Sequence, residues 1–384
     1  MKDDVKAIIS VIIILLLISG IGLFGGYIFL VENTDEMPKQ LFQGIVQTIL
    51  PEEEEVSNTI VDEGQEDFSN KIASAIKNEQ SKQENIIDEE KPKVEEESYS
   101  YYYQQLNSYE KIIYDGMKNN KENLKTGTYK LDFGDVFDEL LNQEDGVDLL
   151  QEYYQSGMES YLYDNPDVFY LEPTKMYINI QTTKKLFTTT YDVYIDQGNN
   201  ANYLTESYST KSQIIDSENQ IEQEVQKILG SINETGDYEK ILAIHDYLVE
   251  NVVYEESLTK SNIYNMYGTL VNKESVCEGY AKAFKYLMDQ IGIDSIVVIG
   301  KATDSNGNTQ NHAWNYVYLN NAWYAVDVTW DDPILIGGGF LSPRLKYKYF
   351  LKGSRTMSVD HVESYTFVEN GKVYTHPTLT PIDY

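Results

Sequence analysis

A stretch of 25 residues without a charged side chain, residues 7–31, constrains this chain more than any other feature. A helix of that length rises roughly 37 Å, enough to cross a hydrocarbon core of about 30 Å with some tilt. A cleaved signal peptide is the alternative, but its apolar part is usually about 7–15 residues long and ends in small residues. Here residues 28–31 run directly into Glu32. We therefore expect a cytoplasmic tip and an uncleaved transmembrane anchor at residues 1–31.

The charges that flank this stretch indicate its orientation. Lys2 and Lys6 precede it, whereas residues 32–36 contain no Lys or Arg. Since positive side chains favour the cytoplasmic side and acids count little, the bulk of the chain is expected outside. The sequence thus predicts a single-pass protein of the cell membrane whose C-terminal domains are extracellular.

Acidic residues dominate the chain, with 62 Asp and Glu against 30 Lys and Arg and a formal charge of −32. This balance argues against a nucleic-acid partner, because phosphate binding needs basic clusters. The acids concentrate in residues 32–98, where Phe42 and Phe68 are the two aromatic residues. Such a segment buries too little apolar surface to fold, so we interpret it as a disordered acidic linker.

Residues 99–233 have the pattern of a mixed helix and strand domain. Apolar residues at helical spacing predict helices near residues 101–117 and 149–162. Runs of β-branched and aromatic residues at 176–182 and 186–195 predict a hairpin, and a polar helix is expected at 217–232. No motif here indicates a chemistry, and its many tyrosines are more typical of a core than of a binding surface.

Residues 234–384 form the second predicted domain. A helix is expected at 237–252, and a second one begins near Cys277 and ends at Gly292. A buried strand is predicted at 295–300. Two alternating runs, 311–319 and 322–329, then predict a hairpin closed by the two asparagines at 320–321.

Cys277 is the one cysteine of the chain, so no intramolecular disulfide can form. Counting alone leaves two interpretations open, a reactive thiol or a small buried hydrophobic residue. Papain-type chemistry needs a thiolate, which a helix N-terminus and a nearby imidazolium stabilise. The position of Cys277 at the predicted helix start favours the reactive thiol.

The predicted hairpin selects the histidine. A two-residue loop at 320–321 places Leu319 opposite Ala322, and the same register continued places His312 opposite Thr329. Because side chains alternate between faces, His312 and Asp327 then project from one face as diagonal neighbours. An imidazole and a carboxylate in that relation form a base with its orienting acid, which a thiol on an overlying helix can approach.

At these residues the chain resembles the transglutaminase-like superfamily, and within it the bacterial cell-surface branch. The resemblance lies in Val-Cys-Glu-Gly-Tyr-Ala at 276–281, Asn-His-Ala-Trp-Asn at 311–315 and Trp-Tyr-Ala-Val-Asp-Val-Thr-Trp-Asp-Asp-Pro at 323–333. It extends upstream to Ile-His-Asp-Tyr-Leu at 244–248 and downstream to Asp-His at 360–361, and it covers about residues 237–364.

The resemblance implies an α+β, papain-like core, in which a central helix carrying the cysteine packs against an antiparallel sheet. It also implies a catalytic triad of Cys277 as nucleophile, His312 as acid and base, and Asp327 as the residue that fixes the imidazole tautomer. The candidates for an oxyanion donor or a substrate pocket are Tyr267, Trp314 and Trp330.

No cofactor or metal is expected. The loop that begins at residues 304–308 lacks the glycine at the sixth place and the glutamate at the twelfth place of a calcium loop. His245 and His361 have no cysteine or carboxylate cluster at zinc spacing. We expect a thiol enzyme that acts on a protein or peptide substrate at the cell surface, including one associated with the cell wall. Its reaction is acyl transfer or hydrolysis. The alternative is a non-catalytic surface module that binds cell-wall polymer or a partner protein.

Overall fold

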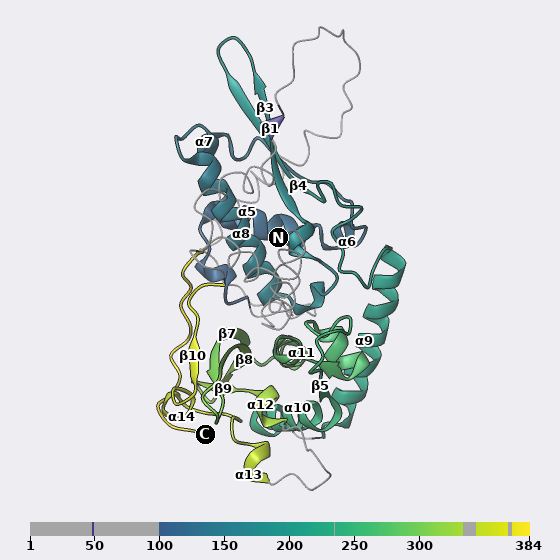
Figure 1. Ribbon diagram of the computed structural model, residues 1–384, viewed down its shortest axis with the longest axis vertical. Coiled ribbons are helices and arrows are strands. Elements are labelled where there is room, and N and C mark those ends of the chain that lie inside the picture. Colours follow the sequence, from purple (N-terminus) through teal and green to yellow (C-terminus); the bar gives the residue numbers. More distant parts are fainter. Residues whose placement is uncertain (1–47, 50–99, 234, 333–342, 368–370) are drawn as a thin grey trace, which may run out of the picture. The chain divides into compact units, whose positions relative to one another are not determined.

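The computed structural model describes residues 48–49, 100–233, 235–332, 343–367 and 371–384 (Figure 1). The predicted anchor lies outside these residues, as does the linker apart from residues 48–49. Within the described part of the chain, no helix combines the length and the apolar character needed to span a membrane.

Two long helices organise the region after residue 100. Helix α5 (Ser108–Asn119) begins with a capping box, in which Asn107 accepts from backbone N–H groups and Glu110 accepts from the Asn107 backbone N–H. It packs on α8 (Gly146–Asp164), where Gly157 lets the helices approach closely, since a Cβ there would lie 2.6 Å from the Glu110 carbonyl oxygen. The predicted helices are confirmed, although α5 starts only at Ser108.

A four-stranded sheet with the order β1-β3-β4-β2 lies in the same region. Strands β3 (Tyr177–Lys184) and β4 (Thr189–Asp196) form the predicted hairpin, with its turn a few residues later than expected (Figure 1). β2 (Leu131–Gly134) pairs with β4 in antiparallel fashion, and the two-residue β1 (Thr48–Ile49) pairs with β3 in parallel.

Two further helices lead to the region of Cys277. Helix α9 (Lys211–Ser231) starts six residues before the predicted position, because Thr210 and Gln213 form a capping box. Helix α10 (Asp237–Asn251) matches its prediction and buries Ile241, Ile244 and Leu248. Two short strands follow, β5 (Val253–Tyr254) and β6 (Glu274–Ser275), which pair in parallel.

The central helix α11 (Cys277–Gln290) packs against a second sheet with the order β10-β7-β8-β9. Its strands are all antiparallel and comprise β7 (Ser295–Thr303), β8 (Thr309–Leu319), β9 (Ala322–Val326) and β10 (His361–Glu363). This helix and sheet form the α+β core that the resemblance implies.

The β8–β9 hairpin has the predicted turn. Asn320 and Asn321 have φ angles of 51° and 63°, as a two-residue loop of this kind requires, and Leu319 pairs with Ala322. The register holds up to the pair of Asn315 with Val326. The predicted strand to Thr329 is wrong beyond that point, because α12 (Val328–Asp331) begins there.

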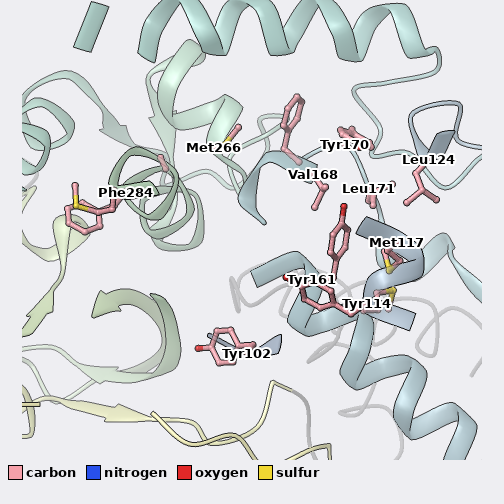
Figure 2. Packing of buried hydrophobic residues seen from close by; sticks show 14 of the residues in the cluster. Tyr102, Tyr114, Met117, Leu124, Tyr161, Val168, Tyr170, Leu171, Met266 and Phe284 are labelled. Carbon is pink, nitrogen blue, oxygen red and sulfur yellow. The ribbon is translucent and has the colours of Figure 1, made fainter. Parts of the chain in front are cut away.

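Buried contacts join the region before residue 233 to the region after it. The Tyr102 hydroxyl donates to the Val297 carbonyl oxygen at 2.6 Å, and the Ser160 and Tyr374 hydroxyls are 3.0 Å apart. Figure 2 shows Tyr102, Tyr114 and Tyr161 with Phe284 of α11 among residues of one buried cluster. All described residues belong to a single compact unit.

The remaining elements are short: η1 (Tyr103–Gln105), α6 (Lys121–Leu124), α7 (Asp138–Leu141), η2 (Pro166–Val168), η3 (Pro173–Lys175), η4 (Gly268–Asn272), α13 (Pro343–Lys346) and α14 (Ser354–Met357).

Candidate active site

Cys277 is the first residue of α11, as predicted. Its backbone N–H and those of the next residues have no acceptor earlier in the helix, and the positive end of the helix dipole lies there. Gly279 allows the preceding segment to fold over this turn, because a Cβ at Gly279 would lie 2.1 Å from Ser275 Oγ and 2.6 Å from the Ile263 carbonyl oxygen. The Cys-Glu-Gly motif thus needs a glycine for steric reasons.

His312 and Asp327 are in direct contact. His312 Nε2 lies 2.7 Å from Asp327 Oδ2, and both side chains are buried. The carboxylate can only accept, so Nε2 carries the proton of this hydrogen bond. The nitrogen left for the thiol is therefore Nδ1.

Asp327 reaches this position in a way that the strand register did not predict. It follows the last residue of β9 and is the N-cap of α12, where its Oδ1 accepts from the Trp330 backbone N–H at 3.1 Å. Thr329 is helical and does not oppose His312. On its other edge, β8 pairs with β7, where His312 lies opposite Gly300. The two catalytic candidates meet as predicted, but a helix cap and not a strand pair sets the carboxylate.

The sequence suggested that the helix of Cys277 covers the sheet face that carries His312, but α11 covers the opposite face. Cys277 and Ala281 pack with Val297 and Ala313, so α11 covers the face of the odd-numbered β8 residues. His312 shares the other face with Trp314, because their positions differ by two. Because β9 ends at Val326, the β8–β9 pairing of the described residues stops at Asn315, three residues after His312.

The electrostatics of the site favour a charged imidazole. Burial lowers the pKa of His312, but the charge and hydrogen bond of Asp327, followed by the hydrogen bond and charge of Cys277, raise that pKa to about 10. Burial raises the pKa of Asp327, but His312 and then His361 lower it well below its usual range. The arrangement therefore stabilises an imidazolium beside the carboxylate of Asp327.

The two predicted tryptophans pack around His312. The Trp330 ring lies 5.3 Å from the His312 ring, and the Trp314 ring lies 6.0 Å from it in a stacked orientation. Trp314 is 1% exposed. Both residues therefore shield the imidazole from water, and Trp314 also lines a small cavity together with His361 and Met357.

Tyr267, the predicted aromatic donor, lies elsewhere. Its hydroxyl donates to Gln220 Oε1 at 2.9 Å and its ring stacks on Phe169, and no contact among the described residues joins it to Cys277. Tyr254 fits the role better. It pairs with Ser275, two residues before Cys277. Burial raises the pKa of Tyr254, and the nearby Cys277 charge raises it further, so its hydroxyl remains a proton donor.

His361 is the second residue that the sequence did not assign to the site. Its Nε2 lies 3.0 Å from Asp327 Oδ2, the oxygen that also accepts from His312. Sequence spacing showed no cysteine or carboxylate cluster for His361, but the fold brings it to Asp327. Nitrogen and oxygen atoms of His312, Asp327 and His361 lie within 4.8 Å of one another. Because these atoms are hydrogen-bonded to each other, we assign them no metal.

Residues 226–328 match the family model of the transglutaminase-like superfamily. This segment is a transglutaminase-like domain. It contains Cys277, His312 and Asp327, whereas His361 lies beyond the matched residues.

The chain is also similar to individual proteins. Kyphoscoliosis peptidase of Mus musculus is 26% identical over 104 residues, which are 24% of this chain and 16% of that protein, so the chain spans only a small part of this curated relative. The crystal structure of a TGase is 15% identical, covering 46% of this chain and 50% of that chain, with a TM-score of 0.27. A putative cysteine protease from Cytophaga hutchinsonii is 16% identical, covering 42% and 68%, with a TM-score of 0.24.

Proposed function

We propose that this protein is a cell-surface thiol enzyme that acts on peptide-like amide bonds through a Cys277–His312–Asp327 triad and a thioester intermediate. One observation carries the proposal. His312 hydrogen-bonds Asp327 at 2.7 Å through one ring nitrogen. Cys277, the first residue of α11, adds to the raised pKa of His312 after Asp327. Nucleophile, base and orienting acid in this relation are the parts that acyl transfer through a thiol requires.

The proposed reaction has two steps. In the first, the Cys277 thiolate attacks the amide carbonyl carbon, the C–N bond breaks, and the His312 imidazolium gives its proton to the leaving amine. In the second, His312 takes a proton from water or from an acceptor amine, which attacks the thioester and releases the thiolate. Asp327 keeps the imidazole in the orientation that presents Nδ1 to the sulfur.

The negative charge that develops on the carbonyl oxygen needs hydrogen-bond donors. The Cys277 backbone N–H is one donor, because the first turn of a helix leaves it without a helical acceptor. The Tyr254 hydroxyl is the second donor that we propose, in place of Tyr267. A phenol near the thiol that stays protonated meets this requirement.

Burial of the thiol bears on the choice between transfer and hydrolysis. Cys277 is 5% exposed and shares its cluster with Tyr163 and Phe367, whose rings stack 4.3 Å apart. Exclusion of water at this position slows hydrolysis of a thioester and favours an amine acceptor. Transglutaminase-type acyl transfer is therefore our first candidate and cysteine-peptidase hydrolysis our second. The predicted anchor at residues 1–31 would display the domain on the outer face of the cell membrane.

The experiment uses the full-length chain with a glutamine-containing and lysine-containing protein such as denatured casein. Attachment of a biotinylated primary amine reports transfer, and new peptide N-termini report hydrolysis. Both signals should vanish in Cys277→Ala, and a mass increase on Cys277 should appear when the acyl-enzyme is quenched in acid. A wild-type chain that forms no such adduct and whose thiol reacts like free cysteine at every pH would contradict the proposal.

A further inference from the structure

His361 stands where it can act on the triad. Its Nε2 lies 3.0 Å from Asp327 Oδ2 and its Nδ1 lies 2.8 Å from Asp360 Oδ1, while its side chain is only 1% exposed. Asp327 therefore serves two imidazoles through one oxygen, since His312 Nε2 lies 2.7 Å from the same atom. A carboxylate that orients one histidine has no need of a hydrogen bond from a second histidine.

The two partners of His361 determine its protonation. Both are carboxylate oxygens, and an ionised carboxylate can only accept. Both ring nitrogens of His361 must therefore carry a proton for its two hydrogen bonds to form at once. In that state His361 is a cation between Asp327 and Asp360, with its ring centre 5.6 Å from that of His312.

The fold builds a specific place for this ring. Its centre lies 4.7 Å from the Trp330 ring and 5.1 Å from the Tyr349 ring, both in edge-to-face orientation. The edge strand β10 can approach His312 this closely because Gly300, the pairing partner of His312, has no side chain. A Cβ at Gly300 would lie 2.2 Å from the Val362 carbonyl oxygen.

We propose that His361 is a positioning residue of the same site: it holds the Asp327 carboxylate by a second imidazole hydrogen bond and, as a cation, limits how strongly Asp327 stabilises the His312 imidazolium. This inference rests on the proposed function for its catalytic meaning. The physical claim itself concerns only the charge balance around Cys277, so it can be tested without a substrate.

The sign of the effect follows from the charges around the two imidazoles. Those that face them are Cys277 from α11, Tyr254 from β5, Asp327 and Asp331 from the β9–α12 segment, and Lys348, Tyr349 and Asp360 before β10. A cation 5.6 Å from His312 disfavours a second positive charge there. Removing it should raise the pH at which His312 loses its proton by about two units at an effective dielectric near 20.

The test measures alkylation of the full-length chain by iodoacetate as a function of pH. Cys277 is the single cysteine, so the rate reports this thiol alone. The reagent is an anion and reacts fastest while an imidazolium stands beside the thiolate, so its rate falls on the alkaline side when His312 deprotonates. In His361→Gln, which keeps a donor but no charge, this alkaline limit should move up by about two pH units.

Two further variants separate charge from packing. His361→Phe keeps an aromatic ring among Trp330 and Tyr349 but loses both hydrogen bonds, and it should shift the limit in the same direction and lower the plateau rate about tenfold. His376→Gln is the matched control, because His376 Nδ1 has no hydrogen-bond partner among the described residues, and its profile should equal that of the wild type.

Several results would overturn the inference. An unshifted profile in His361→Phe would reduce the role of His361 to packing, and a downward shift in His361→Gln would refute the charge balance. A wild-type thiol that shows no alkaline limit at all would instead remove the activated thiolate and with it the proposed function. The two failures are thus distinguishable.

Discussion

Replacement of Asp327 by asparagine should reverse the hydrogen bond that orients His312. Asp327 Oδ1 accepts from the Trp330 N–H at the start of α12, so the amide oxygen of an asparagine is needed there. The amide NH₂ then points at the imidazoles, where Oδ2 had accepted. His312 Nε2 must become an acceptor, and the neutral ring carries its proton on Nδ1, the nitrogen that faces Cys277. Such a ring cannot take a proton from the thiol or from an acceptor.

The magnitude follows from the charge that is lost. Two opposite unit charges about 4 Å apart attract by about 4 kcal/mol at an effective dielectric near 20. Since about 1.4 kcal/mol corresponds to one pKa unit, the pKa of His312 should fall by about three units from its wild-type value of about 10. A wrong tautomer with retained geometry typically costs roughly 10³–10⁴-fold in kcat.

The assay is again the pH profile of iodoacetate alkylation, combined with amine incorporation into casein. The alkaline limit should drop from near pH 10 to about pH 7 in Asp327→Asn. Asp332→Asn is the control. In the wild type the Tyr280 hydroxyl donates to Asp332 Oδ2 at 2.5 Å, and the amide oxygen of an asparagine can still accept this hydrogen bond. A limit that stays within about half a unit of the wild type, or full activity in Asp327→Asn, would refute the reasoning.

The ion pair of His312 with Asp327 also predicts a pH dependence of the free energy of unfolding. The pKa of His312 is raised on folding from about 6.5 to about 10, so its contribution to the free energy of unfolding is complete below pH 6.5 and is lost as pH rises through 10. The pKa of Asp327 is lowered, so its contribution is present above its ordinary value and is lost on acidification. Urea unfolding should show the wild type losing stability between pH 6.5 and 10, and Asp327→Asn should lose much less over that window.

Two further substitutions test other parts of the site. Tyr254→Phe should lower kcat about 10²-fold with little change in KM if its hydroxyl is an oxyanion donor, whereas Tyr267→Phe should leave both constants unchanged, and equal effects of the two would contradict the assignment. Gly279→Ala should lower the free energy of unfolding by about 1–3 kcal/mol, because its methyl group would overlap Ser275 Oγ and the Ile263 carbonyl oxygen. A urea midpoint equal to that of the wild type would show that this turn tolerates a side chain.

The sequence alone determined the features that depend on neighbouring residues. Hydrophobic spacing predicted α8, α10 and α11, and the asparagine pair fixed the β8–β9 turn and its register as far as Val326. The motif around Cys277 predicted its place at a helix start. These predictions succeed because capping, turn conformation and side-chain alternation act over a few residues.

Tertiary structure decided which distant groups surround Cys277, His312 and Asp327. Asp327 left the strand to cap α12, α11 packed on the face opposite His312 at the level of Ala313, and Tyr254 came near enough to Cys277 for its pKa to be raised. His361 joined Asp327 from 34 residues away. No helical or strand period in the sequence relates Asp327, Tyr254 and His361. Their contacts depend on strand order, on where β9 ends and on close packing at glycine, and these become defined only when the sheet and helix assemble.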